Sequence, residues 1–96
     1  MKVLLSDKAS RDLLRIYSYI AERNPTAAEA LIRRIDQKFD QLADLPFIGR
    51  QRSSLAPGLR SVLVGNHLIF YSVGADSITV VRVIDGCMDI DEEFRR

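Results

Sequence analysis

Apolar residues recur along this chain in two different periods, and the change of period separates a helical first half from a stranded second half. Between residues 7 and 23 the apolar positions are spaced by three or four residues: Ala9, Leu13, Ile16 and Ile20. This spacing places them on one face of an amphipathic helix. Three further residues widen the apolar stripe on one side of that helix: Leu14, Tyr17 and Ala21.

A second amphipathic helix is predicted from about residue 25 to residue 44. Asn24 is suited to the cap position before it, because its side-chain oxygen accepts an otherwise unpaired backbone N–H, and Pro25 is suited to the first turn. The apolar positions again repeat every three or four residues: Ala28, Leu31, Ile35, Phe39 and Leu42. The short link between the two helices predicts an antiparallel helical hairpin.

The second half of the chain contains three apolar runs rich in β-branched and aromatic residues, at 59–64, 67–73 and 78–84. Gly65-Asn66 leaves only two residues between the first two runs, which is the spacing of a tight hairpin turn. The three runs therefore predict a three-stranded antiparallel meander. A short apolar run at 2–5 predicts an edge strand that joins this sheet.

The expected fold is α+β, with the N-terminal strand and the antiparallel helical hairpin packed on one face of a small antiparallel β-sheet. A chain of 96 residues is expected to form one domain over residues 1–96. The middle strand carries apolar residues on both of its faces, for example Tyr71 on one and Phe70 on the other. Because the hairpin covers only one face, the other needs cover from elsewhere.

Three segments can provide that cover: the Pro/Gly-rich loop 45–58, the acidic tail 87–96, or another chain. The loop is punctuated by prolines, glycines and serines and is expected to be irregular. The tail has two apolar anchors, Ile90 and Phe94, and is compatible with a short last strand, a helical turn or a flexible end. A partner chain laid on the sheet is the functional alternative to cover from within the chain.

The formal net charge of +1 gives no argument for nucleic acid or for an anionic membrane. Its distribution is uneven, because residues 46–84 carry four arginines against one aspartate, whereas residues 85–96 carry five carboxylates against two arginines. Cys87 is the only cysteine, which favours a reducing, cytoplasmic location. No apolar run approaches the roughly 20 residues that a membrane-spanning helix needs.

The sequence offers few residues for cofactor or metal chemistry. It has no glycine-rich phosphate loop and no zinc pattern, so no cofactor or metal is expected. His67 directly follows a turn, where an exposed structural histidine is more common than a general acid or base. Arg60 and Arg82 interrupt apolar strands, and a guanidinium there needs an acceptor. Asp85 or the tail carboxylates are candidate internal partners, and a phosphate or a partner carboxylate is the functional alternative.

Four stretches follow one another along the chain: VLLSDKASRDLLRIYSYIAERNP near the N-terminus, the loop PFIGRQR, the hairpin PGLRSVLVGNHLIFYSV and the closing ITVVRVIDG. Together with the order of the predicted elements, these stretches resemble the RelE/ParE superfamily of bacterial toxins. The individual positions that fit are Pro46, Gly49, Arg52, Gly58, Leu59, Arg60, Phe70, Tyr71, Arg82, Val83 and Gly86. The resemblance covers nearly the whole chain.

This resemblance implies the toxin of a type II toxin–antitoxin pair, which forms a hetero-oligomer with a cognate ParD-like antitoxin. ParE-like members of the superfamily bind DNA gyrase and trap it on broken DNA, whereas RelE-like members cut mRNA in the ribosome. A RelE-like nuclease would need basic residues and a tyrosine near the C-terminus, and here the tail is acidic and ends in Phe94. A ParE-like toxin without enzymatic activity is therefore expected. One departure from the ParE-like pattern is that Cys87-Met88-Asp89 replaces the basic residues common after Gly86.

The resemblance and the expected exposure together suggest residues for each activity. Residues expected to contact the antitoxin are Leu14, Tyr17, Arg60, Leu68, Phe70 and Arg82. If the chain were instead a RelE-like endoribonuclease, the expected catalytic residues would be Arg60, His67 and Arg82. A third alternative is a non-toxic module that only binds the antitoxin. Asp substitutions at Tyr17 or Phe70 are expected to weaken the antitoxin complex and to leave the lone chain folded.

Overall fold

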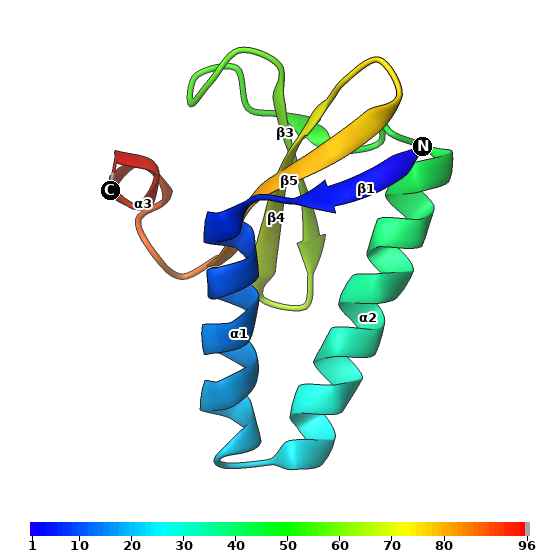
Figure 1. Cartoon of the computed structure of the whole chain (residues 1–96). Coiled ribbons are helices and arrows are strands. Elements are labelled where there is room, and N and C mark those ends of the chain that lie inside the picture. Colours follow the sequence, from blue (N-terminus) through cyan, green and yellow to red (C-terminus); the bar gives the residue numbers. More distant parts are fainter. Residues whose placement is uncertain (96) are drawn as a thin grey trace.

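The computed structural model describes residues 1–95 and contains three helices and a five-stranded sheet (Figure 1). In chain order the elements are β1 (Lys2–Leu5), α1 (Asp7–Ala21), α2 (Pro25–Asp44), β2 (Arg50–Gln51), β3 (Leu59–Val64), β4 (His67–Val73), β5 (Ser77–Asp85) and α3 (Ile90–Arg95). Across the sheet the strand order is β1-β5-β4-β3-β2. The α+β fold is confirmed.

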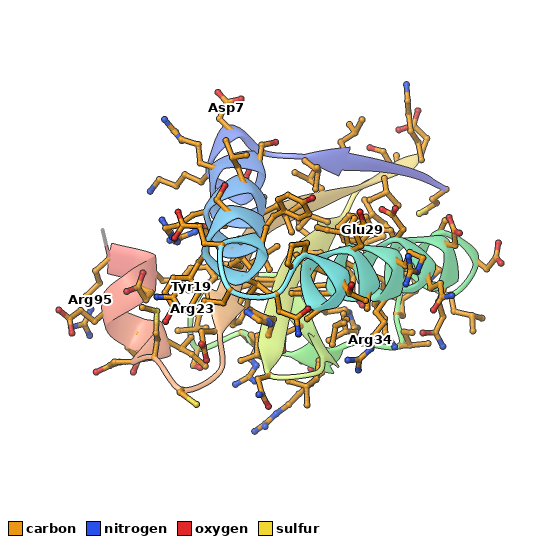
Figure 2. All side chains as sticks on the ribbon, turned by 90° about the horizontal axis from the view of Figure 1, so that it is seen from below. Asp7, Tyr19, Arg23, Glu29, Arg34 and Arg95 are labelled. Carbon is orange, nitrogen blue, oxygen red and sulfur yellow. The ribbon has the colours of Figure 1, made fainter. Side chains whose placement is uncertain are left out.

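Each long helix begins after a residue whose side chain caps it, and for α2 this is the predicted Asn24. The side chain of Ser6 accepts a hydrogen bond from the backbone N–H of Ala9 at 3.0 Å. Asn24 does the same for Ala27 at 3.1 Å, and Pro25 is the first residue of α2. Each bond satisfies a backbone donor that has no partner within its helix. The two helices run side by side, and α1 lies between α2 and α3 in both views (Figures 1 and 2).

The meander β3-β4-β5 is antiparallel, as predicted, but the sheet as a whole is not. β1 pairs with β5 in parallel, from Lys2 opposite Ser77 to Leu5 opposite Val80. The expectation of a wholly antiparallel sheet is thus wrong at this edge, because the chain leaves β1 directly into α1 and returns to it only with its last strand. The loop 45–58 also contributes the two-residue strand β2, which pairs with β3.

The face of the sheet that meets α1 and α2 buries the larger group of apolar side chains, here called the helix-side core. It combines residues of both helices with alternate residues of the strands: Ala9, Leu31, Ile35, Leu42, Val64, Ile69, Tyr71, Ile78, Val80 and Val83. The helical residues are those at the predicted three- and four-residue spacing. This face is the one that hydrophobic periodicity identifies directly.

The opposite face is covered by the chain itself, through the tail and the loop. Leu59, Phe70 and Ile84 form a small buried group, here called the tail-side cluster. Leu55 and Ala56 of the loop, and Ile90 and Phe94 of the tail, pack against it. The Phe94 ring meets the Phe70 ring edge to face, with 4.7 Å between their centroids. A short strand, a helical turn and a flexible end were the predicted alternatives for the tail, and it forms the helical turn, α3.

The edge of β5 is completed by side chains once β1 ends. Pairing with β1 stops at Val80, and Ser6 then donates its hydroxyl to the carbonyl oxygen of Val81 at 2.8 Å. Further along, the carboxylate of Asp12 accepts the backbone N–H of Val83 at 3.0 Å. The start of α1 thus takes over the hydrogen bonds that a longer β1 would have made.

Candidate partner-binding surface

Arg82 joins α1, β5 and the tail through its guanidinium. Its Nε and Nη2 atoms donate to the two carboxylate oxygens of Asp12 at 2.8 and 3.1 Å. Its Nη1 atom donates to the backbone carbonyl of Glu93 at 2.9 Å, and the Glu93 carboxylate lies 3.7 Å from Nη2. Asp12 is buried and also binds Arg15 at 3.0 Å. This two-pronged pairing with a carboxylate suits the planar guanidinium geometry.

The same contacts keep Arg82 charged. Hydrogen bonding to Asp12 raises the pKa of the Arg82 guanidinium, and the negative charges of Asp12 and Glu93 act in the same direction. Burial opposes this rise but does not cancel it. The charge of Arg82 is therefore balanced within the chain, and one of the predicted internal partners, the acidic tail, is confirmed.

Arg60 and Tyr71 together hold the loop that follows α2. The Tyr71 hydroxyl donates to the carbonyl of Pro46 at 2.8 Å and accepts the N–H of Gly49 at 2.9 Å. Arg60 donates from Nη1 to the carbonyls of Phe47 and Gly49, at 3.1 and 2.9 Å. Burial raises the pKa of the Tyr71 hydroxyl, although the Gly49 N–H and the Arg60 charge oppose the rise. Two strand residues thus fix the path of an irregular segment.

A cavity of about 330 Å³ lies between α1, the end of β5 and the tail. Apolar side chains dominate its walls, among them Ile16, Tyr19 and Met88, and polar groups of His67 and Arg82 also reach it. Arg23 lies over the ring of Tyr19 at 4.0 Å from its centroid, and both are labelled at the end of α1 in Figure 2. Arg15, Asp85 and Glu93 line the cavity too, so it is a mainly apolar recess beside the tail with charged groups of both signs in its wall.

Comparison with known proteins identifies the family. A family described as "ParE toxin of type II toxin-antitoxin system, parDE" matches residues 3–90. The chain belongs to the ParE toxin family. It is 36% identical to Toxin ParE1 of Mycobacterium tuberculosis over 95 residues, which is 97% of each chain. It is 32% identical to Toxin ParE3 of Caulobacter vibrioides over 90 residues, covering 93% of this chain and 90% of that protein.

The fold agrees with this assignment. A solved structure described as "Chromosomal ParDE TA system from P. aeruginosa" superposes with a TM-score of 0.74 at 23% identity, covering 88% of this chain and 95% of that one. The chain is therefore a ParE-type toxin of a type II toxin–antitoxin system. Within residues 1–95, no helix is both long and apolar enough to cross a membrane, and no group of side chains is arranged to hold a metal ion.

The ParE fold does not gather the three residues expected for a RelE-like nuclease. Arg60 is opposite Tyr71 and Arg82 is opposite Phe70 in the strand pairing. Successive residues of β4 point to opposite faces of the sheet, so the two arginines lie on opposite sides of it. His67 shares the tail cavity with Arg82 but not with Arg60. Its Nδ1 is a buried polar atom without a hydrogen-bond partner among the described residues.

The residues expected to contact an antitoxin have two different environments. Leu14 and Tyr17 are exposed on α1, at 66% and 36% of their surfaces. Phe70 has no exposed surface and Leu68 is only half-buried beside it in the tail-side cluster. The expected exposure of Phe70 is therefore wrong, because Phe94 covers it. For the same reason Phe70→Asp would place a carboxylate in a buried cluster and damage the lone chain.

Asp12 is the central residue that sequence reasoning missed. It is not part of the apolar stripe predicted for the first helix, yet it is buried and accepts hydrogen bonds from Arg82, Arg15 and Val83. The sequence does contain an indication that Asp12 faces the sheet, because it lies three residues after Ala9 and four before Ile16, at the margin of the apolar stripe. A carboxylate at that margin and an arginine within an apolar strand form a complementary pair.

Proposed function

We propose that this ParE-type toxin acts in the cytoplasm by binding DNA gyrase, without enzymatic activity, and that a cognate ParD-like antitoxin neutralises it in a hetero-oligomer. The family supports the toxin role. The observation that favours a binding mechanism over RNA cleavage is that the arginines a nuclease would require already make hydrogen bonds inside the fold. Arg82 is bonded to Asp12 and Glu93, and Arg60 to two backbone carbonyls.

The chemistry of RNA cleavage explains why those bonds matter. Cleavage needs cations aimed at the phosphate where negative charge develops, together with a general acid and base. Asp12 balances the charge of Arg82, and the tail next to it carries Asp89, Asp91 and Glu92. This arrangement supports a surface that recognises proteins more than one that binds an RNA backbone.

Controlled expression of the chain in bacteria, with growth, chromosome integrity and mRNA cleavage followed together, tests this proposal. We expect growth arrest with DNA breaks and intact mRNA. Codon-dependent mRNA cleavage with an intact chromosome would instead indicate a RelE-like endoribonuclease. The absence of any growth effect would indicate a non-toxic antitoxin-binding module. Co-expression of the ParD-like antitoxin is expected to restore growth.

For the antitoxin we propose a surface on α1 that includes Leu14 and Tyr17, which stay exposed in the lone chain. The matched pair Tyr17→Asp and Tyr19→Asp tests it, because both tyrosines are on α1 but point to different sides of the helix. We expect Tyr17→Asp to weaken antitoxin binding by about tenfold or more, measured by titration calorimetry. Equal affinity of Tyr17→Asp and the unaltered chain would remove this surface.

A further inference from the structure

The outer edge of β3 is open beyond the residues that pair with β2. Leu59 turns its carbonyl toward this edge, where it accepts the N–H of Arg52 at 2.7 Å. Ser61 faces the same edge, opposite Arg50, the first residue of β2. Backbone groups alternate between the two sides of a strand, so the N–H and the carbonyl of Leu63 also point outward. Neither group has a hydrogen-bond partner in the described part of the chain, so both are free to pair with a further strand.

A hollow of about 350 Å³ lies between this open edge and α2. Here called the edge hollow, it is lined by two residues of β3 and four of α2: Leu63, Val64, Arg34, Gln37, Lys38 and Gln41. The four residues of α2 recur at three- and four-residue spacing along one flank of the helix. Leu63 is 60% exposed, so the edge is accessible from solvent. A segment laid along it would have α2 directly beside it.

The helix side of the edge hollow is positively charged and holds no carboxylate. The Lys38 ammonium donates to the Gln41 side chain at 2.8 Å, and Arg34 has no ion pair in the described part of the chain. Three of the four carboxylates of α2 lie about 120° or more around the helix from Arg34. Figure 2 shows one of them, Glu29, on the opposite side of α2 from Arg34. The fourth, Asp44, is about 9 Å along the axis beyond Lys38, so no carboxylate of α2 balances this pair of cations.

The backbone and the charges together define the segment that fits the edge hollow. In antiparallel register, one residue of the segment exchanges two hydrogen bonds with Leu63 and places its side chain beside that of Leu63. Val64 belongs to the helix-side core, so the neighbours of that residue point toward α2. Carboxylates at both neighbouring positions would meet Arg34 and Lys38. The pattern is acidic, apolar, acidic, and a protein fits better than a nucleic acid, whose phosphate backbone has no N–H for the Leu63 carbonyl.

We infer that the ParD-like antitoxin adds an extended segment with the pattern acidic, apolar, acidic to the open edge of β3. The inference rests on the proposed function, in which the same antitoxin also covers Leu14 and Tyr17 on α1. The antitoxin is the partner that a toxin of a type II toxin–antitoxin system has by definition. Strand addition supplies main-chain hydrogen bonds, and the two carboxylates supply specificity through charge. Gyrase and nucleic acid are the competing occupants.

Hydrogen exchange at the Leu63 amide tests the strand addition on the unaltered chain. This N–H has no partner in the lone toxin, so it should exchange fast, and the antitoxin should slow it by about tenfold or more. The Val64 N–H, which faces β4, is the matched control and should be protected in both states. Exchange is measured for the toxin alone, with the ParD-like antitoxin, with gyrase and with a single-stranded DNA oligonucleotide. Equal exchange of Leu63 with and without bound antitoxin would overturn this inference alone.

Two substitutions test the charge and the backbone separately. Arg34→Glu is compared with Arg33→Glu, an equal charge change at an exposed position among the carboxylates of α2. Leu63→Pro removes the outward N–H at an edge position, where proline is tolerated, and circular dichroism checks that this variant folds. We expect Arg34→Glu and Leu63→Pro to weaken antitoxin binding by about tenfold or more, and Arg33→Glu to match the unaltered chain.

The remaining outcomes separate this inference from the proposed function. Full antitoxin affinity of Arg34→Glu would overturn the inference, even if Leu63→Pro did not fold. Protection of Leu63 by gyrase or by the oligonucleotide, and not by the antitoxin, would overturn the choice of occupant. Antitoxin binding that is weakened only by Tyr17→Asp would overturn the inference and leave the proposed function intact. A chain that does not bind the antitoxin at all would overturn both.

Discussion

The two faces of the sheet are buried by very different means. On the helix side, two amphipathic helices of 15 and 20 residues lay a regular apolar stripe across alternate strand residues. On the tail side, a six-residue helix and a turn of the loop cover only three buried side chains. The first face draws its stability from apolar area, whereas the second depends on one ring pair and on Arg82. Replacement of a single residue should therefore change the free energy of unfolding by a different amount, and for a different reason, on each face.

Removal of Asp12 should have the largest effect, because Asp12 connects the two sides through Arg82. Asp12→Ala leaves the Arg82 guanidinium, which is mostly buried, without its main counter-charge, and we expect a loss of about 4 kcal/mol in unfolding free energy by urea denaturation. Asp36→Ala on the exposed side of α2 is the control. A loss below about 1 kcal/mol for Asp12→Ala would mean that Arg82 is compensated by solvent.

Truncation of a side chain in the helix-side core should cause the second-largest loss of unfolding free energy. Ile35 is almost completely buried between α2 and the sheet, so Ile35→Ala should cost about 3 kcal/mol through lost burial and the cavity left behind. Thermal unfolding measures this effect, with Ile48→Ala at an exposed position as the control. A small effect of Ile35→Ala would show that the two helices repack around the missing atoms.

Truncation in the tail-side cluster should cost about half as much. Phe94→Ala removes the edge-to-face contact with Phe70 and part of the cover over the cluster, for an expected loss of about 1.5 kcal/mol. Hydrogen exchange should quicken in α3 while α2 keeps its protection. If Phe94→Ala destabilised the chain as much as Ile35→Ala, the distinction between the two faces would be wrong.

The smallest effect should be a loss of stability in alkali that arises from Tyr71. Its pKa is raised in the folded chain, so the neutral hydroxyl is favoured by folding. Its stabilising contribution is complete below the unfolded pKa of about 10 and is lost as the pH rises through the folded pKa. Urea denaturation between about pH 8 and 11 should show this decline. Tyr71→Phe should have a lower starting stability and a flatter alkaline slope.

The helix-side face could be predicted from the sequence because its periodicity is repeated many times. The cap at Asn24, the hairpin turn at Gly65-Asn66 and the meander all follow from local rules, and the structure confirms them. The parallel pairing of β1 could not be predicted in this way, since nothing in residues 2–5 specifies a partner 75 positions away, as in Lys2 opposite Ser77. Long-range partners leave little trace in a single sequence.

The candidate site was predicted less well, for a related reason. An arginine in an apolar strand needs an acceptor, and the sequence suggests Asp85 and the tail carboxylates for Arg82. The acceptor that matters most is instead Asp12 on α1. Phe70 was expected to be accessible because its cover depends on a tail whose structure the sequence left open. Arg60 was read as a binding group, whereas its bonds to backbone carbonyls show that it shapes the turn beneath Phe47.

The parallel pairing of β1 with β5 also determines when the fold can be completed during synthesis. The hairpin of α1 and α2 relies on contacts close in sequence, so it can form early. β1 has no strand to pair with until Ser77–Val80 has been made, 75 residues further along the chain. β1 therefore stays unpaired until β5 has been synthesised, and the nascent sheet has an open edge at β4 until then. The five-stranded sheet is complete only after β5 has left the ribosome.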